Sequence, residues 1–148
     1  MRRFWQRKPL LVRGAFAAFA DPLTPREVME LAARDEVPSR LVQGRGRRWS
    51  MEHGPIAPAR AKRLPRRDWT VLVQDTQLAS RECARLLAQF DFIPHARVDD
   101  LMVSYAVPGG GVGPHVDSYD VFLLQGTGRR RWQVSTQRDT SVQRITSR

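Results

Sequence analysis

The chain has 148 residues and a formal net charge of +10 at pH 7, with 25 lysine and arginine residues against 15 aspartate and glutamate residues. Its apolar fraction of 41% can build the core of one domain, and its single cysteine, Cys83, excludes an internal disulfide. No apolar run is long enough to cross a bilayer and the N-terminus lacks a secretory signal, which favours a cytoplasmic protein without a membrane partner.

The positive charge is carried mainly by arginine, since Lys8 and Lys62 are the only lysines in the sequence. An excess of this size attracts polyanions and speeds encounter with them. The alternative is compositional, because a high-GC genome favours arginine over lysine. The sequence leaves both interpretations open.

The first part of the chain predicts a strand and a helix. Residues 1–12 are a basic segment that is expected to end in a short apolar strand. Thr24 is the expected N-cap of a helix over residues 25–33, because Pro25 suits the first helical position and Glu27 the third. Apolar residues at helical spacing predict the buried face of this helix: Val28, Leu31 and Ala32.

The middle of the chain predicts three strands with irregular connections. We expect a strand at 37–42 and a glycine-arginine loop at 43–48, and residues 49–54 resemble a strand and turn of a known family. Residues 55–67 hold three prolines among basic residues and predict an irregular surface connection. Residues 69–74 are rich in β-branched and aromatic side chains, which is typical of a strand.

A second helix is expected at residues 78–90, with Asp75 and Thr76 as caps. Its apolar residues would stack on one face: Ala79, Cys83, Leu86, Leu87 and Phe90. The chain then turns back through Pro94.

Residues 101–134 contain three apolar runs separated by turn residues, which predict a meander of short strands. His115 and Asp117 follow a glycine- and proline-rich turn at 108–114 and would share one face of the second strand, roughly 6 to 7 Å apart. An imidazole and a carboxylate, completed by a second histidine, form the facial triad of non-haem Fe(II). Since His-x-Asp is also frequent by chance, a site without metal is the alternative.

The stretch from Gly109 to Trp132, with its Gln-x-x-Gly-x-Arg-x-Trp ending, resembles the iron-binding core of the bacterial ribosomal oxygenases. These are cupin-like JmjC protein hydroxylases, and weaker matches extend the resemblance over nearly all of residues 3–134. It implies a double-stranded β-helix enzyme that uses Fe(II), 2-oxoglutarate and oxygen to hydroxylate an arginine side chain of a large-subunit ribosomal protein. It also implies that full-length members are homodimers. Ribosomal RNA beside such a substrate is one polyanion that the excess positive charge would attract.

Carried over to this sequence, the resemblance makes His115 and Asp117 the iron ligands and Arg130 the partner of the far carboxylate of 2-oxoglutarate. A guanidinium group suits that role because it meets a carboxylate with two parallel hydrogen bonds. By strand parity Arg130 shares a face with Trp132, while Arg129 and Arg131 face the other way. A solvated basic strand is the alternative for these arginines.

The third iron ligand of the family, a later histidine, has no counterpart in this sequence. The other histidines, His53 and His95, precede the core and fit surface or loop positions. Residues 135–148 lack apolar alternation and form an aberrant polar tail, which predicts a truncation or a shifted reading frame. We therefore expect the chain as given to be inactive or weakly active, and an open barrel to make it poorly soluble or oligomeric.

The predicted fold class is α+β, mainly β: the N-terminal part of a double-stranded β-helix with flanking helices and an incomplete barrel. Residues 1–100 would flank the JmjC core, residues 101–134 would form its first strands, and residues 135–148 would form the tail. Two other classes stay open: a non-catalytic basic module that binds ribosome or RNA, and a cupin that binds another metal.

Overall fold

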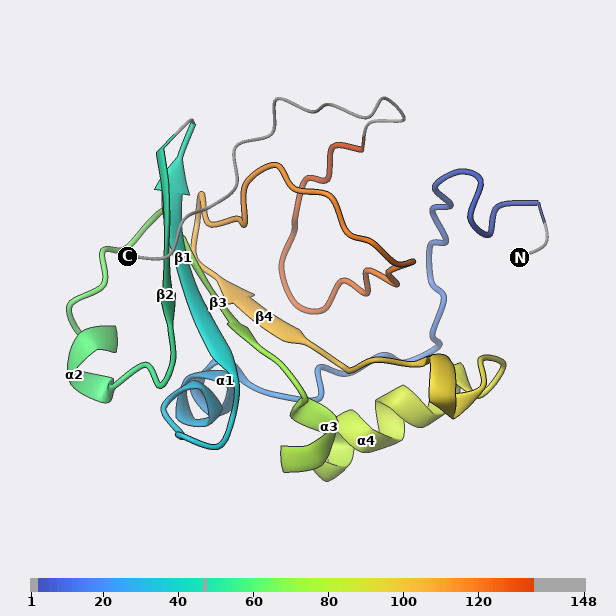
Figure 1. The fold of residues 1–148 in the computed structure, drawn as a ribbon, viewed down its shortest axis with the longest axis horizontal. Helices are drawn as coiled ribbons and strands as arrows, with labels where there is room; N and C mark the ends of the chain where they lie inside the picture. Colours follow the sequence, from blue (N-terminus) through green and yellow to red (C-terminus); the bar gives the residue numbers. More distant parts are fainter. Residues whose placement is uncertain (1–2, 47, 135–148) are drawn as a thin grey trace. The chain divides into compact units, whose positions relative to one another are not determined.

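The computed structural model describes residues 3–46 and 48–134, and the chain divides into two compact units. Within the described chain, residues 22–113 make up the larger unit, and residues 3–21 with 114–134 make up the smaller one. All the regular helices and strands that the structure describes belong to the larger unit (Figure 1). None of these helices is long and apolar enough to cross a membrane.

The larger unit is built on one antiparallel sheet of four strands in the order β2-β1-β3-β4 (Figure 1). β1 pairs with β2 and β3, and β4 pairs with β3. The sheet is open, with β2 and β4 at its edges, so the prediction of an incomplete barrel is confirmed. The strands are β1 (Ser39–Arg45), β2 (Arg48–His53), β3 (Trp69–Val73) and β4 (Val103–Ala106).

β3 is the centre of the core because all five of its residues are buried. Val71 and Val73 have exposed fractions of 0%. Branched and aromatic side chains fit a strand that is covered on both faces, and the strand predicted at 69–74 is confirmed. The other buried members of this core come from α1, β1 and neighbouring loops: Val28, Leu31, Ala32, Val37, Leu41 and Ile56.

Helix α1 (Pro25–Ala32) begins with a capping box. The backbone N–H of Thr24 donates to the Glu27 carboxylate at 2.7 Å, and the backbone N–H of Glu27 donates to the Thr24 hydroxyl at 3.3 Å. The two bonds satisfy donors that the helix itself cannot pair. The predicted N-cap is confirmed, and so is the predicted buried stripe: Val28, Leu31 and Ala32.

The helix expected at 78–90 is divided at Ser80. The structure has α3 (Thr76–Ala79), α4 (Arg81–Leu87) and the 3-10 helix η1 (Ala88–Phe90). Ser80 is extended, and its hydroxyl accepts a hydrogen bond from the backbone N–H of Cys83 at 3.3 Å, so it caps α4 instead of continuing α3. The single-helix prediction is therefore wrong at its start, although Cys83 and Leu86 are buried as the apolar pattern predicts.

The connections contain more regular structure than the sequence predicts. The loop expected at 43–48 is a tight hairpin, because β1 and β2 stay paired up to Arg45 and Arg48. Gly46 has a φ of 62°, a conformation that suits such a turn and that glycine adopts without strain. Short helices also interrupt the other connections: α2 (Pro58–Ala61) and the 3-10 helix η2 (His95–Arg97).

Two groups of predicted strands do not form. Residues 3–12 contain no strand, and residues 107–134 contain neither helix nor strand, so β4 is the one strand of the predicted meander in the described chain. A strand needs a neighbour that pairs its backbone N–H and C=O groups. The pairing with β3 ends just after β4, where the N–H of Val107 donates to the Trp69 carbonyl at 3.3 Å and the Pro108 carbonyl accepts from the N–H of Asp68 at 3.0 Å. No described strand pairs with residues 3–12 or 109–134. The predicted tail at 135–148 lies outside the described residues.

Candidate metal centre

The two predicted metal ligands lie close together in the smaller unit. His115 Nε2 and Asp117 Oδ2 are 3.6 Å apart, and their side chains are 46% and 43% exposed. Two ligand atoms that bind one metal ion at right angles, with bonds of about 2.1 Å, are about 3 Å apart. The His115–Asp117 pair therefore fits two neighbouring positions around one ion after a small side-chain adjustment.

The pair forms without the strand that the sequence predicts. Residues 114–118 are irregular, and the chain reaches them through a glycine run that lies against the sheet of the larger unit. A Cβ at Gly110 would collide with the carbonyl oxygen of Trp69, and Gly113 has a φ of 72° with the Trp49 ring beside it. Because only glycine fits at positions 110 and 113 without strain, these two residues fix the path of the chain after β4.

A third ligand is not among the residues that the structure describes. In residues 3–46 and 48–134, no group of three or more histidine, cysteine, aspartate or glutamate side chains is placed to hold a metal ion. His53 ends β2 and His95 begins η2, and both are exposed. The described residues thus fit the imidazole and carboxylate part of a facial triad and do not complete it.

Arg130, the predicted partner of 2-oxoglutarate, differs from its neighbours in burial. Arg130 is half-buried, whereas Arg129 and Arg131 are exposed. Its guanidinium carbon lies 5.9 Å from the centroid of the Trp132 ring, within the range of a cation–π interaction. Burial lowers the pKa of Arg130, but arginine stays charged near neutral pH and can bind a carboxylate.

Asp21 holds the turn before Arg130, and sequence reasoning missed it. The backbone N–H of Thr127 donates to both carboxylate oxygens of Asp21, each at 3.0 Å. Gln125 completes the turn, since its side-chain amide donates to the carbonyl oxygens of Gly126 and Thr127 at 3.3 and 3.4 Å. No local pattern could reveal the contact, because 106 residues separate its partners in sequence.

The chain around the candidate ligands exposes many large apolar side chains. Trp5 and Phe122, with ring centroids 5.8 Å apart, cover each other only partly and are 37% and 43% exposed. Exposed apolar surface of this kind agrees with the expected open apolar face. The exposed large apolar residues of this stretch are Val116, Tyr119, Val121, Phe122, Leu123, Leu124, Trp132 and Val134.

Comparison with known proteins relates this arrangement to a family. The JmjC domain matches residues 85–148. The ribosomal protein uL16 3-hydroxylase of Escherichia coli is 45% identical over 134 residues, which are 90% of this chain and 35% of that protein. A probable ribosomal oxygenase of Haemophilus influenzae is 41% identical over 144 residues, which are 97% of this chain and 35% of that protein.

Solved structures give the same relationship. The structure of the Escherichia coli ribosomal oxygenase YcfD in complex with cobalt and 2-oxoglutarate superimposes with a TM-score of 0.81 at 43% identity. The match covers 86% of this chain and 35% of that chain. The chain thus spans about a third of the length of these relatives, with the fold of part of a JmjC domain of the cupin class. In sequence and in structure, it is similar to these ribosomal oxygenases over the part of their length that it spans.

Proposed function

We propose that this chain supplies two of the three metal ligands of an Fe(II)- and 2-oxoglutarate-dependent hydroxylase that acts on an arginine side chain of a large-subunit ribosomal protein. The observation that carries the proposal is the 3.6 Å approach of His115 Nε2 to Asp117 Oδ2 inside the segment that matches the JmjC domain. Two comparisons support it: a relative is named a ribosomal protein uL16 3-hydroxylase, and the solved structure of YcfD is a complex with cobalt and 2-oxoglutarate.

Each residue has a distinct role in this proposal. His115 and Asp117 would hold Fe(II), and Arg130 would bind the far carboxylate of 2-oxoglutarate through its planar guanidinium group. Bound Fe(II) and 2-oxoglutarate supply the oxidising power that hydroxylation of an unactivated C–H bond requires. Because the described residues supply two ligands, we expect the chain by itself to hydroxylate weakly or not at all.

The test is a chimaera in which this chain replaces the matching third of the Escherichia coli uL16 hydroxylase. We expect it to add one oxygen atom to an arginine of a uL16 peptide, which mass spectrometry detects and localises. His115→Ala or Asp117→Ala should lower kcat/KM by more than about a hundredfold, since even loss of an outer partner of a metal ligand costs about ten- to a hundredfold. Arg130→Lys should raise the KM for 2-oxoglutarate about tenfold, because lysine keeps the charge but loses the bidentate geometry.

Matched controls separate these roles from general damage. His95→Ala removes an exposed histidine outside the proposed centre, and Arg129→Lys changes the exposed neighbour of Arg130. Both should retain the activity of the parent chimaera. Full activity of the His115→Ala chimaera would refute the ligand assignment, and hydroxylation of a residue other than arginine would refute the proposed substrate group.

A cytoplasmic location, homodimerisation and contact with ribosomal RNA belong to the same proposal. The ribosomal substrate named for the relative and the net charge of +10 support the location and the RNA contact, whereas homodimerisation rests on the resemblance to the family alone. Calorimetry can measure Fe(II) binding to the isolated chain and to its His115→Ala variant. This measurement also tests the alternative of a basic module that binds no metal. Absence of Fe(II) binding to the unaltered chain would favour that alternative, and binding that His115→Ala leaves unchanged would refute His115 as a ligand.

A further inference from the structure

The end of the β1–β2 hairpin and the loop before β3 line an open surface depression of about 840 Å³. We call it the arginine groove, because four exposed arginines line it: Arg45, Arg48, Arg66 and Arg67. Asp68 supplies the one carboxylate among the lining residues, so the groove is strongly positive. Trp49 adds a half-buried aromatic ring.

Hydrogen bonds hold the two sides of the groove in place. The indole N–H of Trp49 donates to the carbonyl of Gly46 at 2.8 Å and braces the hairpin. The backbone N–H of Gly44 donates to the carbonyl of Asp68 at 3.0 Å and ties the hairpin to the loop. The indole N–H of Trp69 donates to the carbonyl of Pro65 at 2.6 Å and anchors the loop on β3. The backbone that carries the arginines is therefore organised before any ligand binds.

This arrangement of charge costs stability. Arg45 and Arg48 are direct cross-strand partners in the hairpin, and like charges in that position repel each other. Among the described residues, no carboxylate forms an ion pair with any of the four groove arginines. Nearby Arg60 is different, since it pairs with Glu52 at 3.0 Å and donates to the Gln43 side chain at 2.6 Å. An anionic ligand would relieve the repulsion in the groove.

We propose that the arginine groove binds the phosphodiester backbone of a single-stranded nucleic acid. Guanidinium groups meet phosphate oxygens with paired, charge-assisted hydrogen bonds. A positive groove with an aromatic ring at its wall is typical of proteins that bind single strands, because the ring gives a base a surface for stacking. The groove lies within residues 43–68 and shares no residue with the His115–Asp117 centre, so it does not depend on the proposed hydroxylase activity.

The test measures binding of fluorescent single strands of about twelve nucleotides, as RNA and as DNA of the same sequence, to the whole chain by anisotropy over a series of salt concentrations. The groove variant replaces all four groove arginines with glutamine. We expect its affinity for the strand to fall at least about tenfold. The slope of log K against log salt should become shallower by about three, because each of the four lost phosphate contacts contributes about 0.7 to the slope. Similar affinities for RNA and DNA would mean that the groove binds the phosphodiester backbone that both share. Tighter binding of RNA would mean that RNA is the preferred ligand. Both results support binding in the arginine groove.

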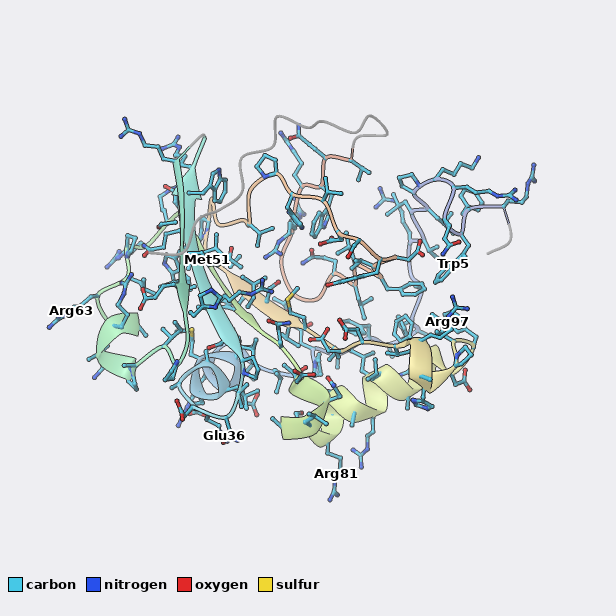
Figure 2. The ribbon with its side chains drawn as sticks, viewed as in Figure 1. Trp5, Glu36, Met51, Arg63, Arg81 and Arg97 are labelled. Atoms are coloured by element: carbon cyan, nitrogen blue, oxygen red, sulfur yellow. The ribbon has the colours of Figure 1, made fainter. Side chains whose placement is uncertain are left out.

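A control variant removes the same charge elsewhere. It carries glutamine at four exposed arginines outside the groove, one of which, Arg81, projects away from α4 (Figure 2). The four positions are Arg13, Arg34, Arg81 and Arg97. We expect at most a twofold loss of affinity in this variant. An equal loss in both variants would overturn the proposal, because binding would then follow net charge alone.

Two further measurements keep the test decisive. Thermal unfolding should show that the groove variant is folded, since removal of the Arg45–Arg48 repulsion should not destabilise the hairpin. Photo-crosslinking of a thiouridine-containing strand to the unaltered chain should modify peptides that contain Trp49 or Arg66. Crosslinks confined to other parts of the chain would overturn the groove assignment.

Discussion

Asp21 and Thr127 are joined by two hydrogen bonds of 3.0 Å across 106 residues of sequence, and this contact fixes the turn that precedes Arg130. Two acceptor oxygens on one N–H hold the turn more firmly than a single neutral bond would. Because the contact is exposed, solvent weakens it, and its effect should be seen in the position of Arg130 more than in overall stability.

Replacement of Asp21 with alanine should therefore impair 2-oxoglutarate binding in the chimaera. We expect the KM for 2-oxoglutarate to rise about threefold to tenfold with a smaller change in kcat, as for loss of one typical hydrogen bond of about 0.5 to 1.5 kcal/mol, because solvent weakens this exposed contact. Steady-state kinetics measure both constants. Asp120→Ala, which removes another exposed carboxylate, is the control. An unchanged KM in Asp21→Ala would show that the turn does not position Arg130.

Loss of the α1 N-cap should destabilise the larger unit. Thr24→Ala removes the hydroxyl that accepts from the Glu27 backbone N–H, and such a change costs about 1 kcal/mol of unfolding free energy. Urea denaturation followed by circular dichroism measures the loss. Ser118→Ala, at an exposed position outside any helix, should leave the midpoint unchanged. Equal midpoints for Thr24→Ala and the parent chain would mean that water replaces the cap at no cost.

The same cap makes stability depend on pH. Hydrogen bonds from the backbone N–H and then the side chain of Thr24 lower the pKa of Glu27. Because the pKa of Glu27 is lower in the folded chain than in the unfolded chain, the ionised carboxylate stabilises the fold. This stabilisation is complete above the pKa of the unfolded chain, about 4.3, and is lost as the pH falls through the pKa of the folded chain. The parent chain should therefore have a higher melting temperature than the Glu27→Gln variant at pH 7, and this difference should become smaller in acid.

Melting temperatures of the two chains between neutral and acidic pH test this expectation. Glu36→Gln controls for the loss of one negative charge at a residue that projects from the surface after α1 (Figure 2). A difference between the parent and Glu27→Gln that does not vary with pH would contradict the proposed role of the Glu27 carboxylate.

The glycine run before His115 should tolerate alanine at some positions and not at others. A Cβ at Gly110 would collide with the backbone of Trp69 in the central strand, whereas a Cβ at Gly111 would meet the Trp49 ring at an ordinary 3.7 Å. Gly110→Ala should cost about 1 to 3 kcal/mol of unfolding free energy, as overpacking does, and Gly111→Ala should cost far less. Chemical denaturation of the two variants compares neighbouring positions directly, and equal stabilities would contradict the close packing at Gly110.

The sequence by itself determined the elements whose causes are local. Thr24, Pro25 and Glu27 specify the start of α1 because a capping box involves residues only three apart. The run from Trp69 to Val73 specifies β3, because a branched apolar segment of that length suits a buried strand. His115 and Asp117 do lie close together, at 3.6 Å, but in an irregular segment and not on the strand from which the spacing argument started, and the resemblance singled out Arg130.

Only the tertiary structure decided the features that depend on distant partners. Whether apolar runs after Ala106 become strands depends on neighbours that pair their backbones, and periodicity carries no information about such neighbours. Ser80 could have continued a helix or capped one, and the fold selects the cap. The Asp21–Thr127 contact and the arginine groove join segments far apart in sequence, so they arise from chain topology, which residue spacing does not encode.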